Sequence, residues 1–201
     1  MNDKPKYNSN IHQRRSIRLK GYDYSQVGLY FITICCKNRE HCFGEIKNGE
    51  MILNDAGIIA NDCWLQIPNH FPNSILHEHI VMPNHIHGII ELKCNNVGAE
   101  NIPPKNVNMN EKFRAINDYN GANNDSPLRS PSKSIGSIVR GFKIGVTKWM
   151  RQNTNVHDVW QRNYYEHIIR NEKSYQTISN YIINNPAKWA EDKFNSTLHC
   201  F

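Results

Sequence analysis

The chain has 201 residues, of which 39% are hydrophobic and 10% aromatic, enough for one domain of ordinary size and too much for a disordered protein. No apolar run reaches the roughly 18 residues of a membrane span, and residues 1–10 are polar, so we expect neither a membrane-embedded nor a secreted protein. Lys and Arg outnumber Asp and Glu by 24 to 18, and the resulting net charge of +6 favours a polyanionic partner.

The first part of the chain is basic and then becomes rich in strands. Residues 1–25 carry six Lys and Arg with little apolar content, and we interpret them as an arm that is either solvated or in contact with nucleic acid. A strand over 29–36 follows, rich in aromatic and β-branched residues. The Asn-Gly dipeptide at 48–49 favours a tight hairpin turn, and a helix is expected to begin at Asn54 or Asp55.

The middle of the chain predicts a strand pair, an insertion and a second helix. The strands cover 74–82 and 85–92, with a tight Pro-Asn corner between them. Residues 94–133 differ in composition, since ten of these 40 residues are Asn and four are Pro. Apolar periodicity disappears there, and we expect a long flexible insertion. Ser134 begins the next helix, whose apolar residues recur at helical spacing.

The last part predicts one strand and one helix. The strand covers 159–169, and Asn171 caps a helix that Pro186 stops. Short turns favour antiparallel neighbours, so the order of elements predicts an α+β fold in which helices pack on one sheet. We expect a single domain over 26–190 and a C-terminal tail over 191–201.

A pair of histidines in the second strand of the pair has the clearest chemical content. Residues i and i+2 of a strand point to the same side, so His85 and His87 project together and can converge on one metal ion. Gly88 leaves room for a ligand or another backbone segment. The preceding strand carries a rival triplet, His77-Glu78-His79, whose Glu is expected to face the opposite layer from the two histidines.

Tyr181 and Asn185 are four residues apart, and therefore lie on one face of the final helical turn. The phenol of Tyr181 either packs at the edge of the apolar stripe or faces a site on the sheet. A neutral phenol is a poor nucleophile at pH 7. A divalent ion held by His85, His87 and the side-chain carbonyl of Asn185 would polarise a phosphodiester for attack. Such a donor set fits Mg²⁺ or Mn²⁺, and the histidines would also accept Zn²⁺.

Basic side chains are candidates for binding the polyanion. Those on the helix that begins at Ser134 fall opposite its apolar side, where a charged face is either solvated or in contact with phosphates. Together with positions in the basic arm and the last strand, the candidates are Arg14, Arg15, Arg140, Lys143, Arg151 and Arg162.

Three motifs resemble those of the single-tyrosine HUH transposases, and most closely the REP-associated tyrosine transposases. They are residues 82–88, 159–170 and 181–186, within a resemblance that covers 27–189. The resemblance implies a ferredoxin-like antiparallel sheet, similar to an RNA-recognition motif, with the histidine pair on a central strand. It also implies a divalent metal, Mg²⁺ or Mn²⁺, held by His85, His87 and Asn185, and Tyr181 as the nucleophile.

The reaction that the resemblance implies is cleavage and rejoining of single-stranded DNA near hairpins, through a 5′-phosphotyrosine intermediate. The expected partner is single-stranded or hairpin DNA, and the protein is expected to be cytoplasmic, nucleoid-associated, and a monomer or homodimer. Two alternatives stay open. One is a non-catalytic nucleic-acid-binding module that stacks bases on an RRM-like sheet. The other is a zinc hydrolase that uses the histidine cluster with Glu78 as its base.

Overall fold

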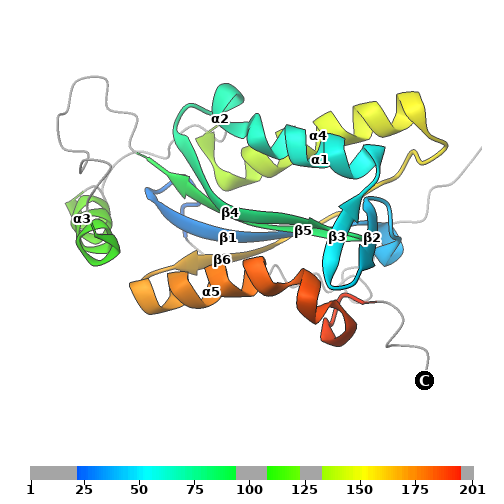
Figure 1. The fold of residues 1–201 in the computed structure, drawn as a ribbon. Coiled ribbons are helices and arrows are strands. Elements are labelled where there is room, and N and C mark those ends of the chain that lie inside the picture. Colours follow the sequence, from blue (N-terminus) through cyan, green and yellow to red (C-terminus); the bar gives the residue numbers. More distant parts are fainter. Residues whose placement is uncertain (1–21, 94–107, 123–132, 196–201) are drawn as a thin grey trace, which may run out of the picture.

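The computed structural model describes residues 22–93, 108–122 and 133–195. At its centre lies a four-stranded antiparallel sheet in the order β4-β5-β1-β6 (Figure 1). Its strands are β1 (Gly28–Cys35), β4 (Ser74–Met82), β5 (His85–Leu92) and β6 (Tyr165–Ile169). The histidine-bearing strand β5 is therefore interior, and the predicted α+β fold with a ferredoxin-like antiparallel sheet is confirmed.

A small hairpin stands apart from the main sheet. It consists of β2 (Gly44–Lys47) and β3 (Glu50–Leu53), which pair only with each other among the described strands. The turn between them places Asn48 at φ 53° and Gly49 at φ 79°, in the left-handed region that Asn-Gly turns tolerate. The predicted turn is therefore where the sequence indicates it.

Helices cover both faces of the sheet, as Figure 1 shows. One face carries α1 (Asp55–Leu65), the short α2 (Ile67–His70) and α4 (Ile135–Asn153), and the other carries α5 (Glu172–Asn184). Helix α3 (Met109–Ala122) contacts α5, and two short 3₁₀ helices, η1 (Lys37–Arg39) and η3 (Pro186–Glu191), lie in the connecting segments. Within the described ranges, no helix combines the length and the apolar character that crossing a bilayer requires.

The main helices begin at the residues that the sequence indicates. A side-chain oxygen of each cap residue accepts a hydrogen bond from the backbone N–H three positions later, which satisfies one of the free donors of the first turn. The cap residues are Asn54 for α1, Ser134 for α4 and Asn171 for α5.

Each face of the sheet has its own apolar core, because side chains alternate along the strands. Residues such as Ile86 and Ile90 of β5 pack toward α1 and α4, where Trp64 and Phe142 are buried. On the other face, Ile89 packs toward α5. His85 and His87 are four and two positions before Ile89 on the same strand, and their side chains therefore point to the same face of the sheet, toward α5.

Two segments differ from the sequence-based expectation. Helix α3 forms inside the predicted insertion and buries Phe113, with Met109 and Ile116 packed beside it. These three residues have i, i+4, i+7 spacing, a short apolar stripe that the many surrounding asparagines obscured. The last strand is also shorter than predicted, since only 165–169 join the sheet and Trp160 makes an isolated bridge with Cys36.

Candidate active site

The two histidines of β5 lie together under α5. Both side chains are buried, and their ring centroids are 4.4 Å apart. Because β5 pairs with β4 on one side and β1 on the other, the backbone that carries the imidazoles is held at both edges. The strand geometry therefore presents two imidazoles to one point, as the His-x-His spacing indicates.

Each imidazole is oriented by a hydrogen bond at Nδ1. His85 Nδ1 lies 2.8 Å from Asn84 Oδ1, and His87 Nδ1 lies 2.8 Å from Thr33 Oγ1. The Asn84 amide nitrogen donates to the carbonyls of Arg39 and Phe194, so its oxygen is the atom that faces His85. An amide oxygen only accepts, and the proton of His85 is therefore on Nδ1, which leaves the Nε2 lone pair free. Partners of this kind orient metal-binding histidines.

The phenol of Tyr181 reaches the histidine pair from α5. Its hydroxyl lies 3.1 Å from His87 Nε2 and 3.4 Å from Asp192 Oδ2. The residue is 37% exposed, so the hydroxyl stands between the buried histidines and solvent. Partial burial, reinforced by the negative charge of Asp192, raises the pKa of Tyr181 to about 12. The hydroxyl is therefore protonated at neutral pH.

Asp192 is a member of the site that the sequence-based reasoning missed. Oxygen and nitrogen atoms of His85, His87 and Asp192 lie within 4.8 Å of one another, and all three residues are buried. Residue 192 belongs to the predicted tail, and no local motif marks it. Only the turn that η3 makes after Pro186 returns the chain to the histidines.

Asn185 is buried beside this group. Its Nδ2 donates to Asp192 Oδ2 over 2.8 Å, whereas its Oδ1 is buried and has no hydrogen-bond partner among the described residues. His85 Nε2 is in the same condition within that part of the chain. Buried polar atoms without partners typically cost about 1–3 kcal/mol each. These two unpaired acceptors lie beside the imidazole of His87 and the carboxylate of Asp192. The four groups together fit a divalent cation, whose ligands are such atoms.

The protonation state of the imidazoles suits metal binding as well. Burial lowers the pKa of His85 to about 3, against the opposing influence of the Asp192 charge. Burial also lowers the pKa of His87 well below its usual value, and the neighbouring His85 lowers it further. Both rings are therefore neutral at physiological pH, which is the form that coordinates metals.

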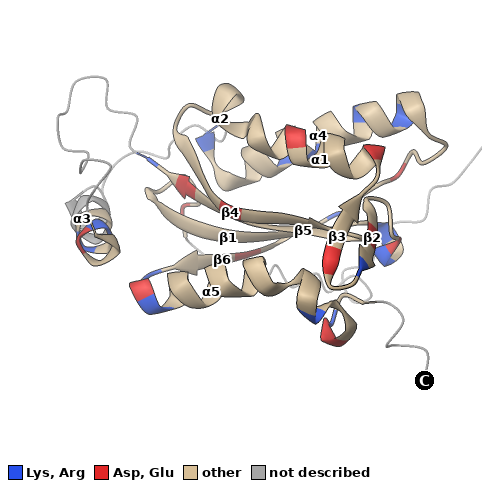
Figure 2. Ribbon diagram, in the orientation of Figure 1, with Lys and Arg blue, Asp and Glu red and all other residues tan. Residues whose placement is uncertain are grey.

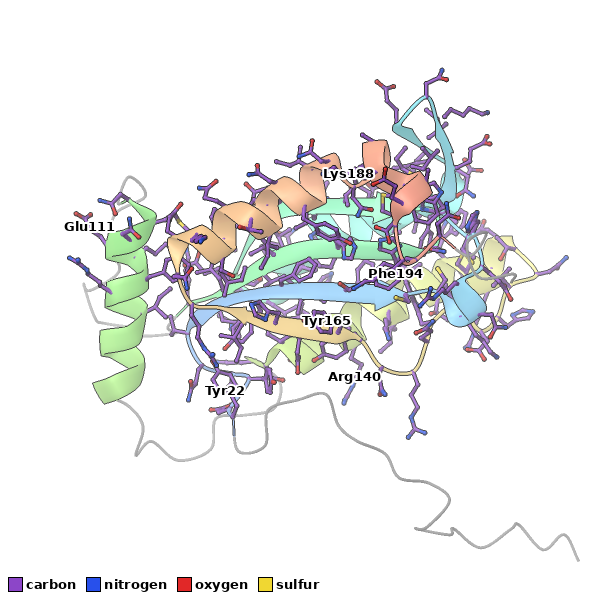
Figure 3. The ribbon with its side chains drawn as sticks, turned by 90° about the horizontal axis from the view of Figure 1, so that it is seen from below. Tyr22, Glu111, Arg140, Tyr165, Lys188 and Phe194 are labelled. Carbon is purple, nitrogen blue, oxygen red and sulfur yellow. The ribbon has the colours of Figure 1, made fainter. Side chains whose placement is uncertain are left out.

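Aromatic residues of η3 and of the segment after it cover the histidine pair. The Phe194 ring centroid lies 4.6 Å from that of His85 and 5.7 Å from that of His87, and Trp189 stacks on His85 at 6.0 Å. Figure 3 views this side of the sheet and labels Phe194. Within the predicted tail over 191–201, Asp192 and Phe194 contact the histidine pair, and the boundaries of the tail stay a prediction.

The candidate DNA-binding side chains do not gather at the site. Lys143 Nζ donates to the carbonyls of Gln161 and Asn163, and it therefore holds the loop before β6. Burial lowers the pKa of Lys143 to about 8. Arg151 donates to the carbonyl of His157. Both belong to α4, on the other face of the sheet from Tyr181. Figure 2 shows basic and acidic residues interspersed over the described elements.

The remaining candidate side chains lie on α4, in the loop before β6 and in the basic arm. Arg140 and Arg162 are exposed. Arg14 and Arg15 lie outside the described residues. The basic arm therefore stays a prediction.

Gly88 has a different role from the expected one. It faces α1 rather than Tyr181, and a Cβ atom there would lie 2.2 Å from Cζ2 of Trp64. The glycine thus makes room for a buried indole in the core. It does not provide access for a ligand.

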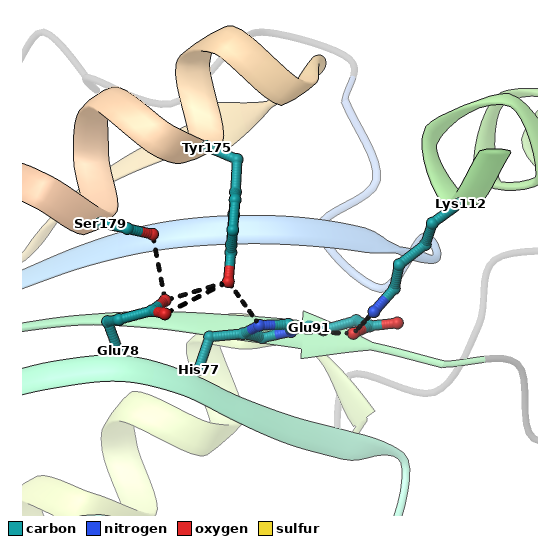
Figure 4. Close-up of polar contacts among 6 residues, drawn as sticks. All are labelled: His77, Glu78, Glu91, Lys112, Tyr175 and Ser179. Carbon is teal, nitrogen blue, oxygen red and sulfur yellow. Dashed lines mark hydrogen bonds and ion pairs between the residues drawn. The ribbon is translucent and has the colours of Figure 1, made fainter. Parts of the chain in front are cut away.

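The rival His-Glu-His triplet does not form one site. A bulge in β4 between Leu76 and His79 turns both His77 and Glu78 toward α5, where both contact Tyr175 (Figure 4). His79 faces α1 and bonds to Asn61. The expectation that Glu78 opposes both histidines is wrong, because the extra residue of the bulge breaks the alternation. A zinc hydrolase built on His77 and His79 does not have the required geometry.

Comparisons with known proteins place the chain among relatives of similar length. No family model matches it. An uncharacterized protein of Haemophilus influenzae is 51% identical over 188 residues, which cover 94% of this chain and 96% of that protein.

Solved structures place the fold. The REP-associated tyrosine transposase bound to a REP hairpin matches with a TM-score of 0.54 and 19% identity, over 89% of this chain and 77% of that one. A putative transposase from Deinococcus radiodurans matches over 84% of this chain and 97% of that one, with 15% identity and a TM-score of 0.38. The chain therefore belongs to the same family as the Haemophilus influenzae protein and has the fold of the REP-associated tyrosine transposase.

Proposed function

We propose that the protein is a metal-dependent tyrosine transposase, which cleaves and rejoins single-stranded DNA beside hairpins through a 5′-phosphotyrosine. The observation that carries the proposal is the 3.1 Å approach of the Tyr181 hydroxyl to His87, within a buried group of two imidazoles and a carboxylate. Support also comes from the three sequence motifs and from the fold shared with a transposase that was solved with a REP hairpin.

The metal-binding part of the proposal assigns His85, His87 and Asp192 as ligands, with Asn185 Oδ1 as a further oxygen donor. When bound, a divalent ion supplies Lewis-acid polarisation of the scissile phosphate. The hydrogen bonds at both Nδ1 atoms keep the imidazoles oriented for this task. Mg²⁺ or Mn²⁺ suits phosphate chemistry with mixed nitrogen and oxygen donors.

Tyr181 supplies the nucleophile. Its oxygen forms a bond to phosphorus, the bond between phosphorus and the neighbouring 3′-oxygen breaks, and the phenolic proton ends on the freed 3′-hydroxyl. The DNA is then attached through its 5′-phosphate, and attack by a 3′-hydroxyl reverses the exchange. One phosphate ester replaces another, so the reaction consumes no nucleoside triphosphate. With a pKa of about 12, the phenol reacts only where its developing charge is stabilised.

The experiment that tests the proposal uses the purified protein with Mn²⁺ and labelled single-stranded oligonucleotides from both flanks of its own gene. We expect a covalent adduct that survives denaturing electrophoresis, and peptide mass mapping should place the DNA on Tyr181. Strong binding of these oligonucleotides without any adduct would contradict the proposal and favour the non-catalytic module.

The structure gives that alternative less support. An RNA-recognition-type module stacks bases on an open sheet face. Here α1 and α4 cover one face and α5 packs on the other. A binding module also has no need of a phenol beside a potential metal site.

A further inference from the structure

We propose that a groove between β6 and α5 binds an unpaired base of the DNA strand, stacked on Tyr165. The inference rests on the function proposed above and adds a subsite next to the reacting phosphate. The groove has a volume of about 450 Å³, within the range of about 300–1,000 Å³ of small-ligand sites. Aromatic, polar and aliphatic side chains line it, among them Phe31, Tyr165, His167, Asn171, Lys173 and Ile178.

The register of the sheet places Tyr165 in line with the candidate metal site. His87 on β5 pairs with Thr33 on β1, and Thr33 pairs in turn with Tyr165 on β6. The three residues thus form one row across the sheet, with backbones about 10 Å apart from first to last, since neighbouring strands are about 4.8 Å apart. A nucleotide adjacent to a phosphate at His87 can reach the third position of this row.

Ring contacts connect the groove with the nucleophile. The Phe31 ring centroid lies 6.3 Å from that of Tyr165 and 6.3 Å from that of Tyr181, with edge-on geometry in both cases. Tyr165 lies on the edge strand β6 and is 49% exposed, whereas Phe31 beside it is buried. Figure 3, seen from this side, labels Tyr165 on β6. Aromatic rings that leave a face free bind bases by stacking, with little regard for sequence.

The charge of the groove also favours a nucleic-acid strand. Lys173, at the beginning of α5, lines the groove and is exposed. None of the described residues that line the groove is acidic. A cation beside an aromatic surface matches a phosphate next to a base, which is the repeating pattern of single-stranded binding sites.

The test compares two fluorescent probes of equal charge, measured by anisotropy in EDTA so that cleavage does not interfere. One is oligothymidylate of about 12 nucleotides, within the site sizes of single-strand-binding proteins. The other is an abasic strand with the same number of phosphates. Stacking predicts that Tyr165→Ala weakens oligothymidylate binding about tenfold and leaves abasic binding unchanged. Tyr165→Phe should bind both probes as the wild type does.

Two further variants separate charge from stacking. Lys173→Gln should weaken both probes alike and reduce the salt dependence of binding, because it removes one phosphate contact. Ile144→Ala removes an exposed apolar side chain from α4, on the other face, and should change neither affinity.

The outcomes distinguish this inference from the proposed function. If the wild type forms the Tyr181 adduct but Tyr165→Ala binds oligothymidylate as tightly as the wild type, the groove assignment alone is overturned. An equal loss for both probes would overturn it as well, since bases would then make no contribution. If the wild type binds neither probe and forms no adduct, the proposed function fails and the subsite fails with it.

Discussion

The hydroxyl of Tyr181 lies 3.1 Å from Nε2 of His87, although 94 positions separate the two residues in the chain. The interior strand β5 carries the imidazole, and α5 carries the phenol across the same face of the sheet. Asp192 closes the group from the segment after η3. This convergence of three elements makes specific predictions about activity and stability.

Replacing Tyr181 with Phe should abolish the covalent DNA adduct, because the attacking oxygen is removed. The ring and its contact with Phe31 remain, and loss of one part-buried hydroxyl should change the free energy of unfolding by about 1 kcal/mol or less. Denaturing electrophoresis measures the adduct, and a gel shift measures hairpin binding, which should persist. An undiminished adduct would refute the assignment of the nucleophile.

Replacing Asp192 with Asn should weaken Mn²⁺ binding by at least about tenfold, since a charged ligand contributes no less than the groups that orient it. Isothermal titration calorimetry measures the affinity directly. Asp158→Asn is the matched control, because Asp158 is an exposed carboxylate paired with Lys37 and should leave Mn²⁺ binding unchanged. Equal Mn²⁺ affinity in both variants would exclude Asp192 as a ligand.

Removal of the metal should stop cleavage without unfolding the protein. The histidines sit on an interior strand with apolar cores on both faces, so the fold does not depend on the ion. EDTA should therefore eliminate the adduct, and added Mn²⁺ should restore it. Cleavage that continues unchanged in EDTA would contradict the metal role.

Replacing Gly88 with Ala should destabilise the protein by about 1–3 kcal/mol, the usual cost of overpacking a core. The new methyl group would lie 2.2 Å from the buried indole of Trp64. Urea unfolding measures the change. Gly28→Ala is the control, since a Cβ there meets Tyr30 at an ordinary 3.6 Å. Similar stability of both variants would show that the indole can move aside.

Replacing Lys112 with Met should destabilise the protein by about 1–3 kcal/mol, because it leaves the buried carboxylate of Glu91 with one partner fewer. In the network of Figure 4, Lys112 Nζ lies 2.6 Å from Glu91, and His77 Nε2 lies 2.9 Å from it. Lys47→Met is the control, because the exposed Lys47–Glu45 pair should contribute less than about 1 kcal/mol.

The Lys112 effect should depend on pH. Burial would raise the pKa of Glu91, but the hydrogen bonds from His77 and Lys112 outweigh it and lower this pKa below the usual value. The network therefore stabilises the fold above the unfolded pKa of about 4.3 and loses this contribution as the pH falls through the lower folded value. Unfolding curves of wild type and Lys112→Met should converge in that acidic range; a constant difference would contradict the assignment.

The parts of the fold that follow from local rules were predictable from sequence. Asn54, Ser134 and Asn171 each mark a helix start because their side chains satisfy a free N–H at the first turn. The position of the histidine pair follows from strand alternation in the same way. Sheet order has no such local rule, and the ferredoxin-like arrangement came from the resemblance.

Other parts depend on distant contacts. Asp192 reaches the histidines only through the turn of η3, and the bulge in β4 changes which layer Glu78 faces. On a helical wheel Lys143 lies on the charged face, where it would be free to bind a phosphate. In the structure its amine donates hydrogen bonds to two carbonyls of a loop 18 and 20 positions away. None of these arrangements leaves a periodic signal in the sequence.

The interior position of β5 means that the histidines and Tyr181 are carried by elements of different local stability. Backbone amides of His85 and His87 lie in a strand bonded at both edges, so we expect their deuterium exchange to be among the slowest in the protein. Helix α5 carries Tyr181 and is held to the sheet by side-chain contacts, among them the hydrogen bonds of Tyr175 and Ser179 to Glu78, so we expect it to open at a lower free energy than the strands. In the proposed covalent intermediate, the DNA end attached to Tyr181 would move with α5, while the strand β5 keeps the spacing of the two imidazoles.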